Sequence, residues 1–94
     1  MKPERRILRF SREEAQVKLG RRVRSAVAFD GVPPGTFGCV MQLDEIEKNN
    51  FDVIVEWYVL IDGKRQHDWF SKEQFERCLV DDLEWDQANK IAVA

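Results

Sequence analysis

The chain has 94 residues, of which 44% are apolar and 34% charged, a balance typical of one small globular domain with a thin core. Such a core leaves little room for an enclosed catalytic cavity, and no stretch approaches the roughly 20 apolar residues of a membrane-spanning helix. Cys39 and Cys78 are far apart and outside any CxxC pair, which fits reduced thiols, so we expect a cytoplasmic protein without a membrane partner and leave a Cys39–Cys78 disulfide open.

Charge is distributed unevenly along the chain, although the formal net charge is only −2. Residues 1–24 carry nine Lys or Arg and three acids, whereas the remaining residues carry six bases and fourteen acids. The start, MKPERRILRF, lacks the apolar run of a secretory signal. Two interpretations stay open: the basic segment folds back onto the acidic body, or its arginines bind phosphates.

Residues 1–20 are predicted to be a basic extension with one short helix. Ser11 and Glu14 have the spacing of a capping box, and Gly20 suits the left-handed residue that ends a helix. The helix is only about two turns long, so it must pack against the rest of the chain. Before it, residues 7–10 predict a short strand or an arm.

Residues 21–86 are predicted to form the folded body, ahead of a tail over residues 87–94. Alternation of apolar and polar residues predicts the strands, and Asn and Asp-Gly pairs predict the turns. The strongest strand is residues 51–61, whose expected inward face consists of Phe51, Val53, Val55, Trp57, Val59 and Ile61. Other strands are expected at 21–29, 37–46, 65–70 and 80–85. A short helix is expected at 72–79, with Ser71 as its cap and Gln74 at the capping-box position.

About five short strands joined by tight turns predict a mainly β fold, a small antiparallel barrel. One short helix precedes the barrel and another precedes its last strand. Closure into a barrel removes the exposed sheet edges, which are a liability for a chain of this size.

Several motifs in this region resemble the small SH3-like barrels. GTFGCV (35–40) resembles their G-x-x-G-x-V turn and strand, and VIVEW (53–57) and WFS (69–71) occupy corresponding places. These barrels include KOW modules, Mind-bomb-type barrels, and the barrel chains of nitrile hydratase and ferredoxin–thioredoxin reductase. The chain also resembles small bacterial proteins of unassigned function that pair a GVPxGTxGxV loop with a WFSK-like segment. The resemblance covers roughly residues 20–85 and implies an SH3-like barrel, but no particular activity.

The loop FDGVPPGTFGCV (29–40) holds three of the five glycines and two of the three prolines. We expect Gly35 and Gly38 to adopt backbone angles that other residues resist, as a sharp barrel corner requires. Such a corner does not account for Val32 and Pro33, an apolar pair that we expect to be exposed. Either these two residues contact a partner, or their role is structural.

Chemistry-bearing residues are sparse. His67 is the only histidine, and two cysteines without a CxxC nucleus bring the zinc ligands to three at most. Gly31, Gly35 and Gly38 are not followed by a Lys and a helix, as a phosphate-binding loop requires. We therefore expect no enzymatic activity, no cofactor and no metal.

A protein–protein interaction or accessory module is the favoured function. Tyr58 and the tryptophans Trp69 and Trp85 are residue types that anchor interfaces. Ile54, Tyr58 and Leu60 share the second face of the strongest strand, which is either covered by the N-terminal helix or presented to a partner. The residues expected to contact another protein are Val32, Pro33, Tyr58, Trp69 and Trp85.

Nucleic-acid binding, in the manner of KOW modules, is the alternative. Its basic stripe would consist of Arg5, Arg6, Arg9, Arg21, Arg22 and Arg24. Phe10 or Tyr58 would be the platform for a stacked base. A small inhibitor protein from a mobile element is a further alternative, which no residue favours specifically. The identity of the partner and the oligomeric state are left undetermined by the sequence.

Overall fold

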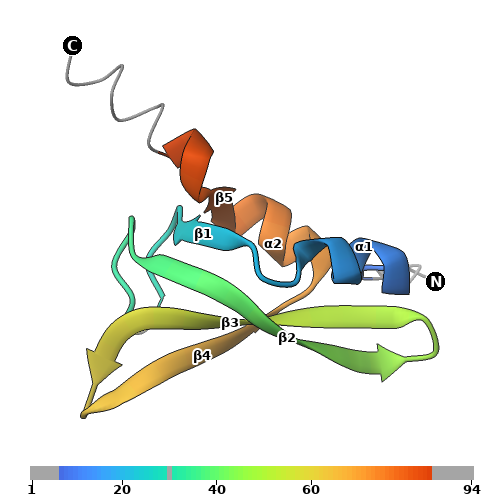
Figure 1. Ribbon diagram of the computed structural model, residues 1–94, viewed down its shortest axis with the longest axis horizontal. Coiled ribbons are helices and arrows are strands. Elements are labelled where there is room, and N and C mark those ends of the chain that lie inside the picture. The colour runs from blue at the N-terminus through green and yellow to red at the C-terminus, as the bar shows by residue number, and fades with distance from the viewer. Residues whose placement is uncertain (1–6, 30, 86–94) are drawn as a thin grey trace, which may run out of the picture.

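A computed structural model of the chain describes residues 7–29 and 31–85 (Figure 1). Its elements are α1 (Arg12–Lys18), β1 (Arg22–Ser25), β2 (Phe37–Glu47), β3 (Asn50–Ile61), β4 (Lys64–Phe70), α2 (Lys72–Cys78) and β5 (Leu79–Asp81). The strands form one antiparallel sheet in the order β4-β3-β2-β1-β5. This confirms a mainly β fold with five strands and two short helices. The sheet is not closed, because β4 and β5 are its two edges. Arg5, Arg6 and the predicted tail lie outside the described residues.

The molecule has two layers (Figure 1). Strands β2, β3 and β4 form a long twisted ribbon, and α1, β1, α2 and β5 lie together over one side of it. We call the side of the sheet toward the helices the inner face and the other side the outer face. Side-chain alternation and strand register place these residues on the outer face: Arg22, Arg24, Phe37, Cys39, Gln42, Asp44, Asp52, Ile54, Glu56, Tyr58, Leu60, Arg65, His67 and Trp69.

The core lies between the inner face and the helices, with β3 at its centre. Of the six residues predicted to face inward from β3, Phe51, Val53, Val55 and Trp57 are buried, and Val59 and Ile61 are half-buried. The Trp57 indole N–H donates to Asp68 on β4 at 2.8 Å, so the largest core side chain has its polar atom satisfied. Helix α1 adds Ala15 to this core, and the arm before α1 adds Phe10. Burial of Phe10 makes its expected alternative role as a base-stacking platform wrong.

Both predicted capping boxes are present. In α1 the Ser11 hydroxyl accepts from the Glu14 amide and Glu14 accepts from the Ser11 amide, while Ser71 and Gln74 exchange the same pair of bonds in α2. The last strand is shorter than predicted, because the Asp81 carboxylate accepts from the Leu83 amide at 2.9 Å. This side-chain bond starts a helical turn over residues 82–85 in place of a strand. In the described part of the chain, no helix is long and apolar enough to cross a membrane.

Strand β1 ends at Ser25, four residues before the predicted end. The Ser25 hydroxyl donates to the Val27 carbonyl, and the next amide, that of Ala26, donates to Cys78 of α2 at 2.8 Å. These bonds take the chain out of the sheet, so the strand predicted over residues 21–29 is wrong beyond Ser25, and the Val27 side chain is exposed.

The glycine-rich loop is a structural corner packed on the core. Phe29 and Val32 exchange two backbone hydrogen bonds of 2.9 Å, and Val32 is only 1% exposed. The expectation that Val32 contacts a partner is therefore wrong, whereas Pro33 is exposed. Gly35 adopts the expected positive φ, +86°, but Gly38 does not. Gly38 is needed for space: a Cβ there would lie 2.6 Å from Trp57 Cε3.

Candidate binding face

A row of stacked side chains crosses the outer face from β1 to β4. Its members, in order, are Arg24, Phe37, Tyr58 and Arg65, and we call them the aromatic–arginine row. The two rings stack with centroids 4.9 Å apart and an interplanar angle of 18°. The Arg24 guanidinium lies 5.2 Å from the Phe37 centroid, and that of Arg65 lies 4.7 Å from the Tyr58 centroid. Arg22 also approaches the Phe37 ring, at 6.0 Å.

Strand register accounts for this row. Arg24 lies opposite Phe37, and the pairing of Gly38 with Trp57 brings Phe37 opposite Tyr58. Directly opposed side chains on one sheet face are close enough to stack. Each ring therefore has an aromatic neighbour on one side and a cation on the other.

Both terminal arginines of the row are held by further contacts. Arg24 donates to Asp82 at 2.7 Å and to the Gly35 carbonyl at 3.1 Å. Arg65 donates to Glu56 at 2.8 Å, and His67 lies 3.1 Å from the other oxygen of that carboxylate. The hydrogen bond from Arg65, assisted by that from His67, holds the pKa of Glu56 below its ordinary value, despite partial desolvation. The row is thus preorganised, with few free rotamers left to order on binding.

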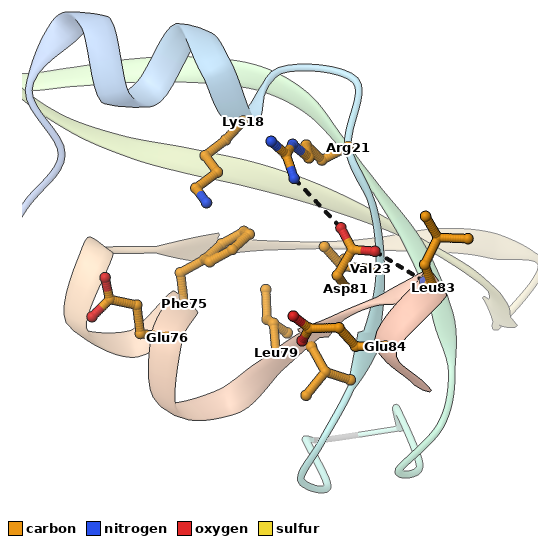
Figure 2. Close-up of a pocket in the computed structure, with 10 residues that line it drawn as sticks. Lys18, Arg21, Val23, Phe75, Glu76, Leu79, Asp81, Leu83 and Glu84 are labelled. Carbon is orange, nitrogen blue, oxygen red and sulfur yellow. Dashed lines mark hydrogen bonds and ion pairs between the residues drawn. The ribbon is translucent and has the colours of Figure 1, made fainter. Parts of the chain in front are cut away.

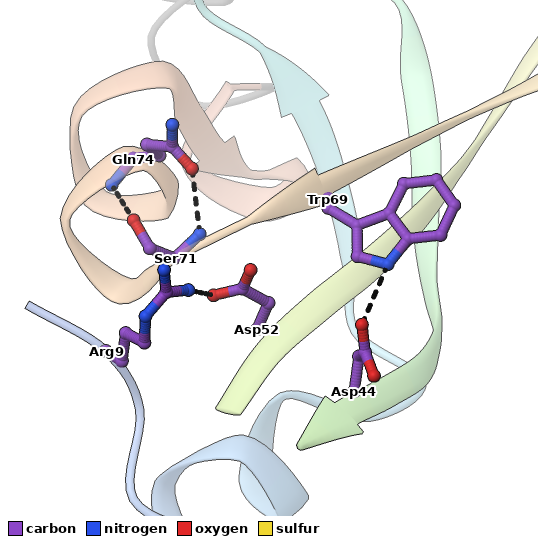
Figure 3. A network of polar contacts seen from close by, with 6 residues as sticks. All are labelled: Arg9, Asp44, Asp52, Trp69, Ser71 and Gln74. Atoms are coloured by element: carbon purple, nitrogen blue, oxygen red, sulfur yellow. Dashed lines mark hydrogen bonds and ion pairs between the residues drawn. The ribbon is translucent and has the colours of Figure 1, made fainter. Parts of the chain in front are cut away.

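Trp69 occupies the other end of the outer face (Figure 3). It projects from β4 and donates its indole N–H to Asp44 of β2 at 3.2 Å, so the ring crosses the intervening strand β3. The residue of β3 opposite Trp69 is Ile54, which is only 8% exposed. At the same end Arg9, from the arm before α1, pairs with Asp52 (Figure 3).

Helix α1 does not cover this face, because its buried residue, Ala15, packs into the core on the inner side. Of the two possibilities that the sequence left open, the exposed one applies to most of the face. Tyr58 is 45% exposed, Leu60 68% and Trp69 53%. Large apolar side chains on one open sheet face are a feature of interaction surfaces.

Two charges of the outer face have no opposite charge within 4.0 Å in the described part of the chain, namely Arg22 and Asp44. Arg22 lies on β1 opposite Cys39, beside the aromatic–arginine row. Asp44 lies on β2 opposite Asp52, at the Trp69 end. Through Cys39, Arg22 is level with Glu56 near the middle of β3, whereas Asp44 is level with Asp52 near its start.

The structure gathers four of the predicted site residues on this face: Tyr58, Trp69, Arg22 and Arg24. Arg9 lies at the Trp69 end of the same face, where it pairs with Asp52, whereas the other predicted site residues that the structure describes lie elsewhere. Trp85 is half-buried against the loop, with its Cζ2 atom 3.0 Å from where a Gly35 Cβ would be. Arg21 faces the opposite side and pairs with Asp81 at 3.5 Å.

Phe37 and Arg65 are members of the row that the sequence analysis did not assign to a site. Each lies on a predicted strand, but their positions beside Tyr58 depend on the register between strands. The Asp62-Gly63 hairpin turn is the one local signal that could have placed Arg65 across from the end of β3.

An open groove of about 540 Å³ lies on the other side of the sheet, between the end of α1, β1, α2 and β5 (Figure 2). Its floor includes Val23, Phe75 and Leu79, while Lys18 and Arg21 lie along one rim. Lys18 is 5.2 Å from the Phe75 centroid, and Arg21 is paired across the groove with Asp81. Both cations of the groove, Lys18 and Arg21, therefore already have a partner within the chain.

The described residues include no group of three or more His, Cys, Asp and Glu side chains able to hold a metal ion. Cys39 and Cys78 are free thiols, which answers the open question of their pairing.

Comparisons of the chain with protein-family models, with curated proteins and with solved structures found no match.

Proposed function

We propose that the protein is a non-catalytic interaction module that binds another protein through the outer face of its sheet. The observation that carries this proposal is the exposure of Tyr58, Leu60 and Trp69 on a face that neither helix covers. Tyrosine and tryptophan combine a large apolar area with a polar atom, and they dominate the binding energy of protein interfaces. A partner would bury these side chains around the aromatic–arginine row.

The preorganisation of the row favours binding. A side chain that is already ordered loses less conformational entropy when a partner covers it. Tyr58 is held between Phe37 and Arg65, and the Trp69 indole is held by Asp44. The face thus offers rigid aromatic side chains that are surrounded by both acidic and basic residues.

Leu60→Ser tests the proposal most cleanly, because Leu60 is the most exposed apolar residue of the face. The tagged chain and this variant would be incubated with the same lysate, washed at high salt after nuclease treatment, and the retained proteins compared by mass spectrometry. We expect a protein retained by the parent to be lost with Leu60→Ser. Val17→Ser, at an exposed position on α1, is the matched control and is expected to retain it. Retention of the same proteins by both variants would contradict the proposal.

Tyr58→Ala is a second probe of the same face. It removes the ring that stacks on Phe37, so we expect it to abolish retention while lowering the free energy of unfolding by only about 0.5–1.5 kcal/mol. A denaturant titration measures that change. A much larger loss of stability would show that Tyr58 belongs to the core and not to a binding surface.

Nucleic-acid binding is the second candidate function, and the position of Arg22 favours it. Arg22 and Arg24 flank the Phe37–Tyr58 stack, an arrangement that resembles a base-stacking platform with cations for phosphates. Binding of a fluorescent single-stranded oligonucleotide that weakens steeply with salt, and is lost in Arg22→Ala, would favour this candidate over the first.

We also propose that the open sheet is a variant of the SH3-like small barrel and that the protein works in the cytoplasm. Two features support the barrel relationship: β1 pairs with both β2 and β5, and a short helix precedes the last strand. The two free thiols support a reducing compartment.

A further inference from the structure

We infer that a further interaction surface lies along one edge of β2, where an extended basic segment of another protein adds a strand to the sheet. Strand β2 has eleven residues, but β1 and the residues just before it pair only with positions 37–40. The far half of β2 extends past β1 (Figure 1), and in the described part of the chain no residue pairs with that side of residues 41–47. We call residues 41–47 the free segment of β2. The inference does not depend on the proposed function, because it uses backbone groups at an edge and not the outer face.

The hydrogen bonds of β3 show which backbone groups of the free segment are available. Phe51 lies opposite Glu45 and exchanges backbone hydrogen bonds of 2.8 and 3.1 Å with Phe10, on the other side of β3. In an antiparallel pair, two opposed residues that do not bond to each other direct their amide and carbonyl groups away from each other. The amide and carbonyl of Glu45 therefore point to the free edge, and alternation along β2 gives Leu43 the same orientation. Such a row of unpaired backbone groups is what an added strand recognises.

The charges of this edge indicate a basic partner. The free segment contains Asp44, Glu45 and Glu47 and no Lys or Arg. Asp44 lies opposite Asp52 on the outer face, and like charges that oppose each other destabilise a sheet. Asp52 is paired with Arg9, whereas Asp44 has no opposite charge within 4.0 Å among the described residues. A cation on the added strand, beside Asp44, supplies the missing charge.

The two faces of the sheet determine the pattern of side chains in the partner. Alternate side chains of an added strand lie beside Leu43 on the inner face and beside Asp44 on the outer face. Leu43 is half-buried and packs against the core, so an apolar side chain beside it extends that core. The expected partner is therefore an extended segment in which apolar and basic residues alternate. A second copy of the same edge does not fit, because acids would then face acids.

The test of main-chain recognition uses a short fluorescein-labelled peptide in which Val and Lys alternate. Its binding to the full chain is followed by fluorescence polarisation. Every strand pair of this sheet is antiparallel, and an antiparallel addition with the Val side chains on the inner face directs the Val amides toward β2. We expect N-methylation of the Val amides to weaken binding by at least about tenfold, because it removes the hydrogen bonds to β2. N-methylation of an equal number of Lys amides is expected to leave binding unchanged.

Asp44→Asn tests the charge of the edge. It keeps an oxygen that can accept from the Trp69 indole but removes the carboxylate charge. We expect the dissociation constant of the peptide to rise about two- to fivefold at low salt. Asp62→Asn makes the same change in the turn between β3 and β4, at an exposed position whose φ of +53° suits Asn, and is the matched control. It is expected to bind as the parent does, and so is Leu60→Ser.

Four outcomes overturn the inference. The first is a peptide that shows no saturable binding, and the second is an equal effect of the two methylated sets, which would mean that side-chain charge alone holds the peptide. The third is a loss of affinity in Asp62→Asn as large as that in Asp44→Asn. The fourth is loss of binding with Leu60→Ser, which would place the peptide on the outer face. Thermal midpoints within a few degrees of the parent confirm that each variant is folded.

Discussion

At the scale of single residues, the fold depends on the absence of a side chain at Gly38. Gly38 lies on β2 directly against the Trp57 indole, and a Cβ there would be 2.6 Å from Trp57 Cε3 and 2.9 Å from Val55 Cγ1. Both neighbours are fully buried, so neither can move outward. The glycine lets the largest core ring pack directly against the backbone of the neighbouring strand.

Gly38→Ala is expected to lower the free energy of unfolding by about 1–3 kcal/mol, because overpacking a close-packed core forces side chains off their preferred rotamers. Gly38→Val is expected to be worse. Trp57→Phe provides room for the added methyl group, so the double variant is expected to be less destabilised than the sum of the single variants, by at least about 0.5 kcal/mol. Urea titrations of the four proteins measure this coupling.

Gly20→Ala is the matched control for this cycle. Its Cβ would have open space, but its φ is +83°, so we expect a backbone cost of about 1–2 kcal/mol. Trp57→Phe should not relieve that cost. If the Gly38 and Trp57 substitutions were additive, the close approach would not be the reason for the glycine.

Gly38 also marks a limit of sequence-based prediction at this scale. The sequence indicates that a glycine is needed in the loop region, and Gly35 has the positive φ that was expected. For Gly38 the same expectation is wrong, because its reason is a neighbour 19 residues away in the chain. The expectation that Val32 is exposed was wrong for a similar reason. Whether an apolar residue in a Pro- and Gly-rich loop is exposed or buried depends on what the loop packs against.

At the scale of elements, the two short helices stabilise each other. Each is only seven residues long, which is too short to be stable alone. Lys72, at the start of α2, donates to Glu14, which is itself the capping-box residue of α1. Glu14 therefore both caps its own helix and joins it to the other. The hydrogen bond from Lys72, followed by that from the Ser11 amide, lowers the pKa of Glu14 from 4.5 to about 2.

This lowered pKa predicts a pH dependence of stability. The folded protein holds the Glu14 proton more weakly than the unfolded chain does, so the stabilisation is complete above about pH 4.5 and is lost as the pH falls toward about 2. Glu14→Gln keeps the capping box but has no charge to lose. We expect the parent to melt at a higher temperature than Glu14→Gln near neutral pH, and the difference to disappear by about pH 2.

Thermal midpoints of the two proteins, measured by circular dichroism between pH 7 and pH 2, provide the comparison. Because both side chains are partly exposed, the difference at neutral pH is expected to be small and to shrink with added salt. A difference that persists unchanged at pH 2 would show that Glu14 acts through its shape and not through its charge.

The elements were predicted best where the signal is local. Both capping boxes and the alternation along β3 involve residues within a few positions of one another, and the structure confirms them. The ends of β1 and of the last strand were predicted wrongly. There Ser25 and Asp81 bond to nearby backbone atoms and take the chain out of the sheet, although the apolar pattern continues past both positions.

At the scale of the whole molecule, the candidate site arises from strand register. The sequence indicated Tyr58, Trp69, Arg22 and Arg24, but as members of two competing sites. Only the pairing of four strands brings all of them to one face, and it adds Phe37 to the row between Arg24 and Tyr58. Register between strands distant in the chain depends on bulges, such as those of β2 near Val40 and Glu45, which alternation alone does not predict.

The open sheet also determines which parts of the molecule can pair with another chain. Strand β4 has β3 on one side, and in the described part of the chain no strand pairs with its other side. Its edge carries Lys64, Arg65 and Asp68, and charged side chains along an edge strand discourage pairing with the edge of another sheet. These charges therefore disfavour extension of the sheet at the β4 edge.

Amide hydrogen exchange followed by nuclear magnetic resonance tests whether the sheet is open. Along an edge strand of an antiparallel sheet, alternate amides point away from the neighbouring strand and have no ladder partner. We therefore expect fast and slow exchange to alternate along Lys64–Phe70, and slow exchange for most of β3, which β2 and β4 flank. Uniformly slow exchange along β4 would mean that another strand pairs with this edge, and the sheet would then be closed or extended in solution.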